Sequence, residues 1–83
     1  MKEGSCLAVC ASIHDVISLE KLLKADGHWC EMIPTPRAVS SDCGMSLVCH
    51  IETHAALTGI AAVNRVRVAQ TYQMLNGELL PLP

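Results

Sequence analysis

One cysteine lies in a sequence context that favours thiol chemistry. Cys43 falls in a polar stretch that begins at Pro34 and Pro36 and separates two segments apolar enough to be buried strands, whereas the other cysteines have apolar neighbours. A thiol reacts as its thiolate, which cations, hydroxyl groups and backbone amides stabilise. Groups of these kinds surround Cys43 in the sequence: Arg37, Ser40, Ser41 and Gly44. Cys43 is therefore the candidate reactive residue, although the negative charge of Asp42 beside it opposes thiolate formation. The alternative is an ordinary surface cysteine in a hairpin loop.

The remaining cysteines and the histidines do not define a second site. Cys10, Cys30 and Cys49 fall in apolar segments, where a small buried sulfur is common, and Cys6 lies near the N-terminus. No C-x-x-C pair is present, so we expect no metal site and no bound cofactor. A Cys–His pair needs one histidine as base. The spacing selects none of the four: His14, His28, His50 and His54.

The composition describes one small domain. The chain has 83 residues, of which 51% are hydrophobic, but only one Trp, one Tyr and no Phe. The core must therefore consist of aliphatic residues, methionines and cysteines. We expect a single domain over residues 1–83, with a core at about residues 7–72 and a C-terminal tail at residues 73–83.

Several classes of function find no support in the sequence. A net charge of −2 with scattered basic residues gives no electrostatic footprint for nucleic acid. No segment approaches the ~20 apolar residues of a membrane span, and the first apolar run is too short for an export signal. We therefore expect a cytoplasmic protein, in which structural disulfides are rare. Paired carboxylates, a G-x-G-x-x-G fingerprint and a P-loop are missing, so hydrolase, dehydrogenase and nucleotidase functions are not indicated.

The spacing of the apolar residues predicts four strands and two helices along the chain. Strands are predicted at residues 7–11, 29–33, 45–51 and 65–72. A first helix is predicted to begin after a Ser12 cap and to end before Gly27, and a second to extend from a Thr53 cap to about Val63.

This β-α-β-β-α-β order predicts an α+β fold. The expected architecture is a two-layer, ferredoxin-like sandwich with both helices on one face of an antiparallel sheet. The other face is expected to be wet or to form an interface; its residues are Ser46, Val48, His50, Arg65 and Arg67. The tail from Asn76 to Pro83 is expected to be a loose arm or a contact with a partner.

The loop and the helix that precedes it resemble those of a known family. The string Pro34-x-Pro36-Arg37-x-Val39-Ser40-Ser41-x-Cys43-Gly44 follows a helix that contains Glu20-Lys21-Leu22-Leu23-Lys24 and is ended by Gly27. Over roughly residues 7–72 the chain is similar to the family of putative selenium/sulfur carrier proteins. The resemblance implies a persulfide or selenosulfide on Cys43, surrounded by an anion pocket of Arg37, Ser40, Ser41 and Gly44.

The resemblance also implies partners: a donor and an acceptor of sulfur or selenium, and either a larger enzyme or a second copy of the chain. The protein is expected to be a carrier or accessory protein rather than a stand-alone enzyme. Two other functions fit the same sequence. One is a binding or subunit module that docks on a larger enzyme. The other is a redox sensor, in which a second thiol near Cys43 forms a disulfide with it.

Overall fold

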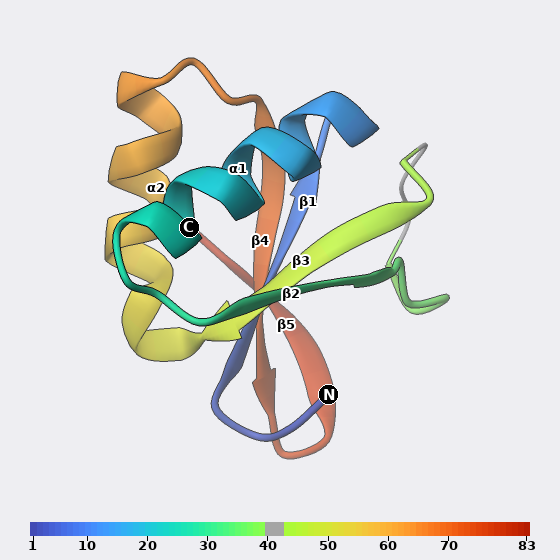
Figure 1. The fold of residues 1–83 in the computed structure, drawn as a ribbon. Coiled ribbons are helices and arrows are strands. Elements are labelled where there is room, and N and C mark those ends of the chain that lie inside the picture. Colours follow the sequence, from blue (N-terminus) through green and yellow to red (C-terminus); the bar gives the residue numbers. More distant parts are fainter. Residues whose placement is uncertain (40–42) are drawn as a thin grey trace.

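A computed structural model describes residues 1–39 and 43–83, which form one five-stranded sheet covered on one face by two helices (Figure 1). The strands are β1 (Ser5–Cys10), β2 (Cys30–Pro34), β3 (Met45–His50), β4 (Val68–Leu75) and β5 (Glu78–Leu82). The helices are α1 (Ile13–Ala25) and α2 (His54–Val63), and a 3-10 turn, η1 (Ile51–Thr53), leads into α2. The predicted two-layer α+β architecture is confirmed.

The sheet is antiparallel throughout, with the strand order β2-β3-β1-β4-β5. β3 lies between β1 and β2, so the first β-α-β unit is split and β1 occupies the centre of the sheet. Apolar side chains from β1, β3 and both helices form the main core between the layers, and this core includes all five cysteines. In the part of the chain that the structure describes, neither helix is long and apolar enough to cross a membrane.

The ends of α1 follow the predicted capping residues. Ser12 is the N-cap: its hydroxyl accepts a hydrogen bond from the Asp15 amide at 3.4 Å and donates one to the Asp15 carboxylate at 2.9 Å. At the other end Gly27 has a φ of +82°, and the next amide, of His28, returns to the Leu23 carbonyl at 2.9 Å. Glycine reaches this left-handed conformation without steric cost, which ends the helix.

The start of α2 differs from the prediction. Thr53 has helical φ and ψ values and makes no side-chain capping bond, because the chain already turns into η1 at Ile51. The strand predicted at residues 65–72 is also shifted, to Val68–Leu75. Arg65 has a φ of +57°, which breaks the extended backbone directly after α2, so the strand begins later.

The C-terminal tail is a strand, and the expectation of a loose arm was wrong. β5 pairs with β4 from Leu75 opposite Glu78 to Thr71 opposite Leu82. The two turn residues, Asn76 and Gly77, have φ values of +51° and +76°. Positive φ at both positions is the requirement of the hairpin turn that Asn-Gly favours.

The second face of the sheet is partly covered, and the expectation that it is wet was wrong for its centre. β1 is apolar at almost every position, so it presents apolar side chains on both faces of the sheet. Leu7 and Val9 are the ones that face away from the helices. They form a small second core with Val48 and with Val39 from the loop between β2 and β3. Ser46 is fully buried on β3, whereas His50 remains exposed.

One carboxylate joins the start of α1 to the segment before β4. Asp15 accepts a hydrogen bond from the Arg67 amide at 3.1 Å and forms an ion pair with the Arg67 guanidinium at 3.1 Å. The bond from the Arg67 amide, then the Ser12 hydroxyl and the Arg67 charge, lower the pKa of Asp15. The carboxylate therefore stabilises the folded chain while it is ionised.

This predicts a specific dependence of stability on pH. Because the pKa of Asp15 is lower in the folded state, its contribution is complete above the unfolded value of ~4 and is lost as the pH falls through the folded value. In urea denaturation, Asp15→Asn should be less stable than the wild type at neutral pH, and the gap should close in acid. The exposed Glu52→Gln should behave like the wild type. A gap that is constant with pH would contradict the assignment.

Candidate functional site

Cys43 lies at the base of the loop that joins β2 to β3, and Thr35 fixes its backbone. The Thr35 amide donates to the Gly44 carbonyl at 2.9 Å, which extends the strand ladder one pair beyond Pro34 and Met45. The Thr35 hydroxyl donates to the Cys43 carbonyl at 2.9 Å and lies 2.7 Å from the Ser46 hydroxyl. Since a hydroxyl has one proton, Ser46 is the donor to Thr35 in this arrangement. The two ends of the loop are thus held together at the site.

The Cys43 side chain points into the layer between the sheet and the helices. Successive residues of a strand face opposite sides, so Cys43 shares the face of Leu47 and Cys49. Its side chain belongs to the main core and is only 7% exposed. The thiol donates to the Met45 carbonyl at 3.2 Å. The prediction separated Cys43 from the other cysteines by its polar sequence neighbours, but its side chain belongs to the same core cluster as theirs. Its sequence neighbours are polar, but its side chain packs on the apolar face of the sheet.

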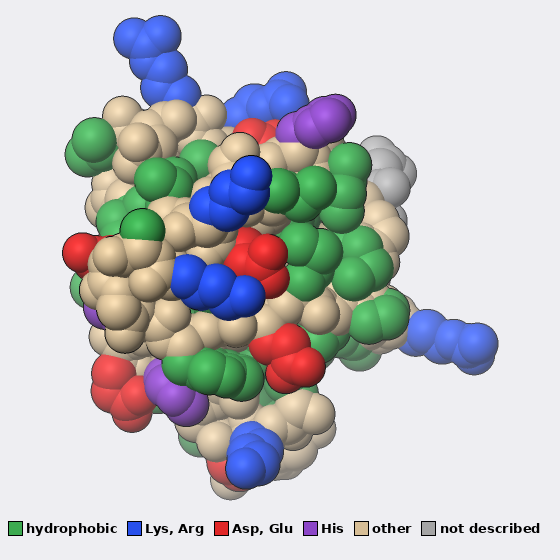
Figure 2. All heavy atoms as spheres, viewed as in Figure 1, with side chains coloured by type: hydrophobic (Ala, Val, Ile, Leu, Met, Phe, Trp, Pro, Cys, Tyr) green, Lys and Arg blue, Asp and Glu red, His purple; other side chains and the backbone are tan. Residues whose placement is uncertain are grey.

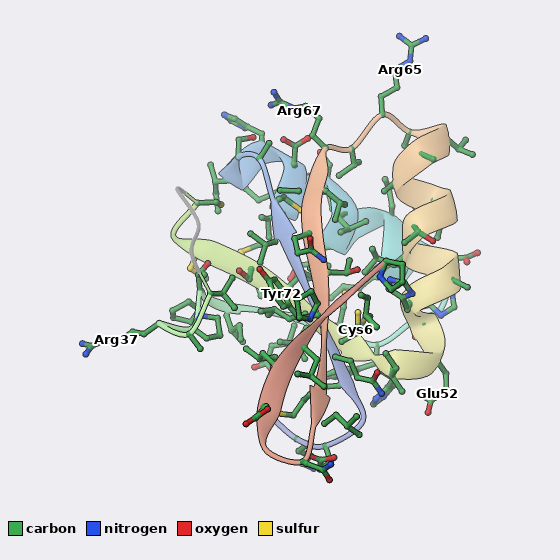
Figure 3. All side chains as sticks on the ribbon, turned by 180° about the vertical axis from the view of Figure 1, so that it is seen from behind. Cys6, Arg37, Glu52, Arg65, Arg67 and Tyr72 are labelled. Atoms are coloured by element: carbon green, nitrogen blue, oxygen red, sulfur yellow. The ribbon has the colours of Figure 1, made fainter. Side chains whose placement is uncertain are left out.

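The other predicted loop residues divide into three groups. Gly44 lies directly beside Cys43, and a Cβ atom at Gly44 would meet no heavy atom within 4 Å. Arg37 lies in a turn closed by the bond from the Val39 amide to the Pro36 carbonyl at 3.0 Å, and its exposed side chain extends away from the molecule (Figure 3). Ser40 and Ser41 lie outside the described residues. The role of Arg37 in binding an anion stays a prediction.

A second thiol, Cys10, lies in the same core cluster as Cys43, and the sequence did not single it out. β1 is antiparallel to β3 and is paired with it up to Ala8 opposite Leu47, so the end of β1 lies toward the start of β3. Cys10 is the last residue of β1 and is 2% exposed. Burial, followed by the negative charges of Asp15 and Cys43, raises the pKa of Cys10 to about 12. Cys10 is thus a protonated thiol within electrostatic reach of Cys43.

The other three cysteines form a row across the opposite end of the helix-covered face. Cys49 is opposite Cys6 on β1 and opposite Cys30 on β2. The hydrogen bond between the thiols of Cys6 and Cys49 lowers the pKa of Cys6 and, together with burial, raises that of Cys49. Burial also raises the pKa of Cys30, whose thiol donates to the Glu20 carbonyl at 3.7 Å. Cys30 and Cys49 are core residues, as predicted, and Cys6, for which only a place near the N-terminus was expected, is buried in the same core. Among the described side chains, no group of three or more His, Cys, Asp or Glu is arranged to hold a metal ion.

Three of the histidines have contacts away from the loop. His50 stacks on Trp29 with ring centroids 4.9 Å apart, and His54 bonds the Thr71 hydroxyl at 3.0 Å. His28 pairs with Asp26 at 3.0 Å. His14 is in the first turn of α1, at the end of the sheet where Cys10 lies, and is exposed.

The comparison with protein families bears directly on this site. The model of the family described as "Putative Se/S carrier protein-like" matches residues 5–73, which include Cys43 and its loop. The match extends from the start of β1 to within β4 and confirms the resemblance drawn from the loop residues. No curated protein and no solved structure matches the chain at a significant level.

The bonds made by the Thr35 hydroxyl lead to a test of how the loop is held. Thr35→Val keeps the shape of the side chain but deprives the Cys43 carbonyl and the fully buried Ser46 hydroxyl of their partner. A buried polar group without a partner costs about 1–3 kcal/mol, so the free energy of unfolding in urea should fall by that amount.

Two matched variants make the interpretation specific. Thr35→Ser keeps the hydroxyl and should lose less stability than Thr35→Val. The double variant Thr35→Val/Ser46→Ala should recover part of the loss, because the unpartnered hydroxyl is gone. Equal stability of Thr35→Val and the wild type would show that these bonds do not hold the loop.

Proposed function

The chain belongs to the putative Se/S carrier protein-like family, and we propose that it carries one atom of sulfur or selenium covalently on Cys43 for delivery to a partner protein. The observation that carries the proposal is the family match over a segment in which the backbone of the loop cysteine is fixed by Thr35. Whether the protein carries sulfur or selenium depends on the donor, because both atoms form the same type of bond to a thiolate.

Loading is an exchange between two sulfur compounds. The Cys43 thiolate attacks the terminal sulfur of a donor persulfide and forms a new sulfur–sulfur bond. The bond inside the donor persulfide breaks, and its electron pair remains on the donor thiolate. The same step with a donor selenopersulfide places selenium on Cys43. In delivery, a nucleophile of the acceptor attacks the terminal atom, and Cys43 leaves as thiolate.

The surroundings of Cys43 suit a polarizable terminal atom. The side chain lies among aliphatic residues and other thiols of the main core, and sulfur makes favourable contacts with such surroundings. An apolar setting also limits the access of water to a reactive adduct. The roles of Arg37, Ser40, Ser41 and Gly44 as an anion pocket remain part of the proposal; Arg37 would have to change its side-chain conformation to reach the adduct.

The surface near the site supports contact with partner proteins. Ile13 and Ile17 on α1 are 39% and 37% exposed. In Figure 2 hydrophobic side chains form a continuous area beside α1, toward the end where β3 begins, while charged side chains of both signs are spread over α1 itself. Exposed apolar surface of this kind is typical of contacts between proteins. We propose that the donor and acceptor proteins bind there.

The proposal predicts where the transferred atom is found. Protein incubated with a cysteine desulfurase and L-cysteine, or L-selenocysteine, should gain the mass of one sulfur or one selenium atom, and fragmentation should assign it to Cys43. Cys43→Ala should not load. Cys30→Ala removes another buried thiol of the same core and should load like the wild type.

Two outcomes would contradict the proposal. One is a wild-type protein that gains no atom under these conditions. The other is equal loading of Cys43→Ala and the wild type, since the atom would then be on a different residue.

A further inference from the structure

Two of the five thiols, Cys10 and Cys43, lie toward the same end of the helix-covered face and belong to one core cluster. Cys10 ends β1, and Cys43 precedes β3 by two residues. The pairing of β1 with β3 ends with Ala8 opposite Leu47, and β1 has an irregularity between Val9 and Cys10 in its pairing with β4. The next side chains on this face toward the same end are those of Cys10 and Met45, and the Met45 carbonyl accepts the Cys43 thiol at 3.2 Å. Both side chains belong to one core cluster and are almost fully buried.

The electrostatics of Cys10 agree with this placement. The charge of Cys43 is one cause of the raised pKa of Cys10, after burial and the carboxylate of Asp15. Coulomb interaction weakens with distance, so this effect agrees with the membership of both thiols in one core cluster. The two sulfurs therefore share one apolar environment and influence each other.

The other cysteines are placed too far along the sheet to react with Cys43. Cys49 follows Cys43 by six residues; the part of this segment that is strand, from Met45 to Cys49, spans four steps of ~3.3 Å, which gives roughly 13 Å. Cys6 and Cys30 are the direct neighbours of Cys49 on β1 and β2. A disulfide requires Cα atoms within about 7 Å, so these three thiols are excluded as partners of Cys43.

We propose that Cys10 is the resolving thiol of the carrier site, which displaces the atom bound to Cys43 as hydrosulfide or hydroselenide. The inference rests on the proposed function and adds a route by which the atom leaves without an acceptor protein. The product is a disulfide between Cys10 and Cys43, and a cellular dithiol is then needed to return both residues to thiols.

The step balances without an added oxidant. The sulfur of Cys10 forms a bond to the Cys43 sulfur, and the bond from Cys43 to the terminal atom breaks. The electron pair of that bond leaves with the terminal atom, which takes the proton of Cys10 and departs as HS⁻ or HSe⁻. The terminal atom is reduced, and Cys10 is oxidised to half of the disulfide. In regeneration, the dithiol is oxidised to its own disulfide.

The chemistry of Cys10 makes this route slow relative to transfer. Only the deprotonated fraction of a thiol attacks, and that fraction is small when the pKa is raised to about 12. Cys10 therefore does not discharge the carrier as soon as it is loaded. An acceptor protein bound at the site competes with Cys10 for the terminal atom.

The test follows a single discharge of loaded protein. Wild type, Cys10→Ala, Cys10→Ser and the control Cys30→Ala are loaded with a cysteine desulfurase and L-cysteine, separated from the donor without reductant, and incubated anaerobically. Three quantities are measured: sulfur retained on Cys43, sulfide released, and disulfides located by fragmentation of non-reduced peptides. The wild type and Cys30→Ala should release about one sulfide for each Cys10–Cys43 disulfide formed. Both Cys10 variants should release sulfide at least ten times more slowly and keep the adduct.

The outcomes separate this inference from the proposed function. If Cys10→Ala and Cys10→Ser load and then release sulfide at the wild-type rate, Cys10 is not the resolving thiol, and the carrier function still stands. A disulfide from Cys43 to any other cysteine would also overturn the inference, as would a Cys10–Cys43 disulfide without release of sulfide, which is the behaviour of a redox sensor. If the wild type does not load at all, both proposals fail.

Discussion

The bonds from Thr35 to Cys43 and Gly44 are the constraint on which the site depends. They extend the β2–β3 ladder by one pair beyond the strands, so Cys43 keeps the alternation of β3 although it precedes the strand. This alternation directs the thiol toward the helices and into the main core. The same loop places Val39 on the opposite face, where it buries the second core of the sheet. Thr35 thus positions the candidate residue, Cys43, on one face, while Val39 of the same loop covers part of the other.

The consequence for function is a buried thiol in a core cluster that contains a second thiol toward the same end of the sheet. β1 is apolar on both faces and occupies the centre of the sheet, so its last residue, Cys10, is buried beside the start of β3. A carrier needs a place where a polarizable atom persists and a way for that atom to leave. In our proposal, Cys43 is the place where the atom persists. The acceptor protein and Cys10 compete to remove it. Neither step requires a metal or a bound cofactor.

Local signals in the sequence predicted most of the fold, and they placed the candidate site on a loop whose geometry they did not predict. Ser12 and Gly27 set the ends of α1 because capping depends on a few adjacent residues. The loop motif indicated the family, which the family match confirms, and Cys43 as the carrier residue stays a prediction. The direction of the Cys43 side chain was missed because polar sequence neighbours do not decide which face of a sheet a residue occupies; the alternation from Leu47 would have predicted it. β5 was missed although Asn76-Gly77 is a strong hairpin signal. The neighbourhood of Cys10 and Cys43 depends on the register of β1 and β3, which no local pattern contains.

The most direct test of the central claim is the mass of the Cys43 peptide in protein isolated anaerobically, without reductant, from cells that make it. Fragmentation assigns any added atom to Cys43 or to Cys49, which lie on the same stretch of chain. The account predicts a fraction of the protein with one additional sulfur or selenium atom on Cys43, and Cys49 unmodified. An adduct on a cysteine other than Cys43, or protein that carries no added atom while a donor is active in the same cells, would contradict it.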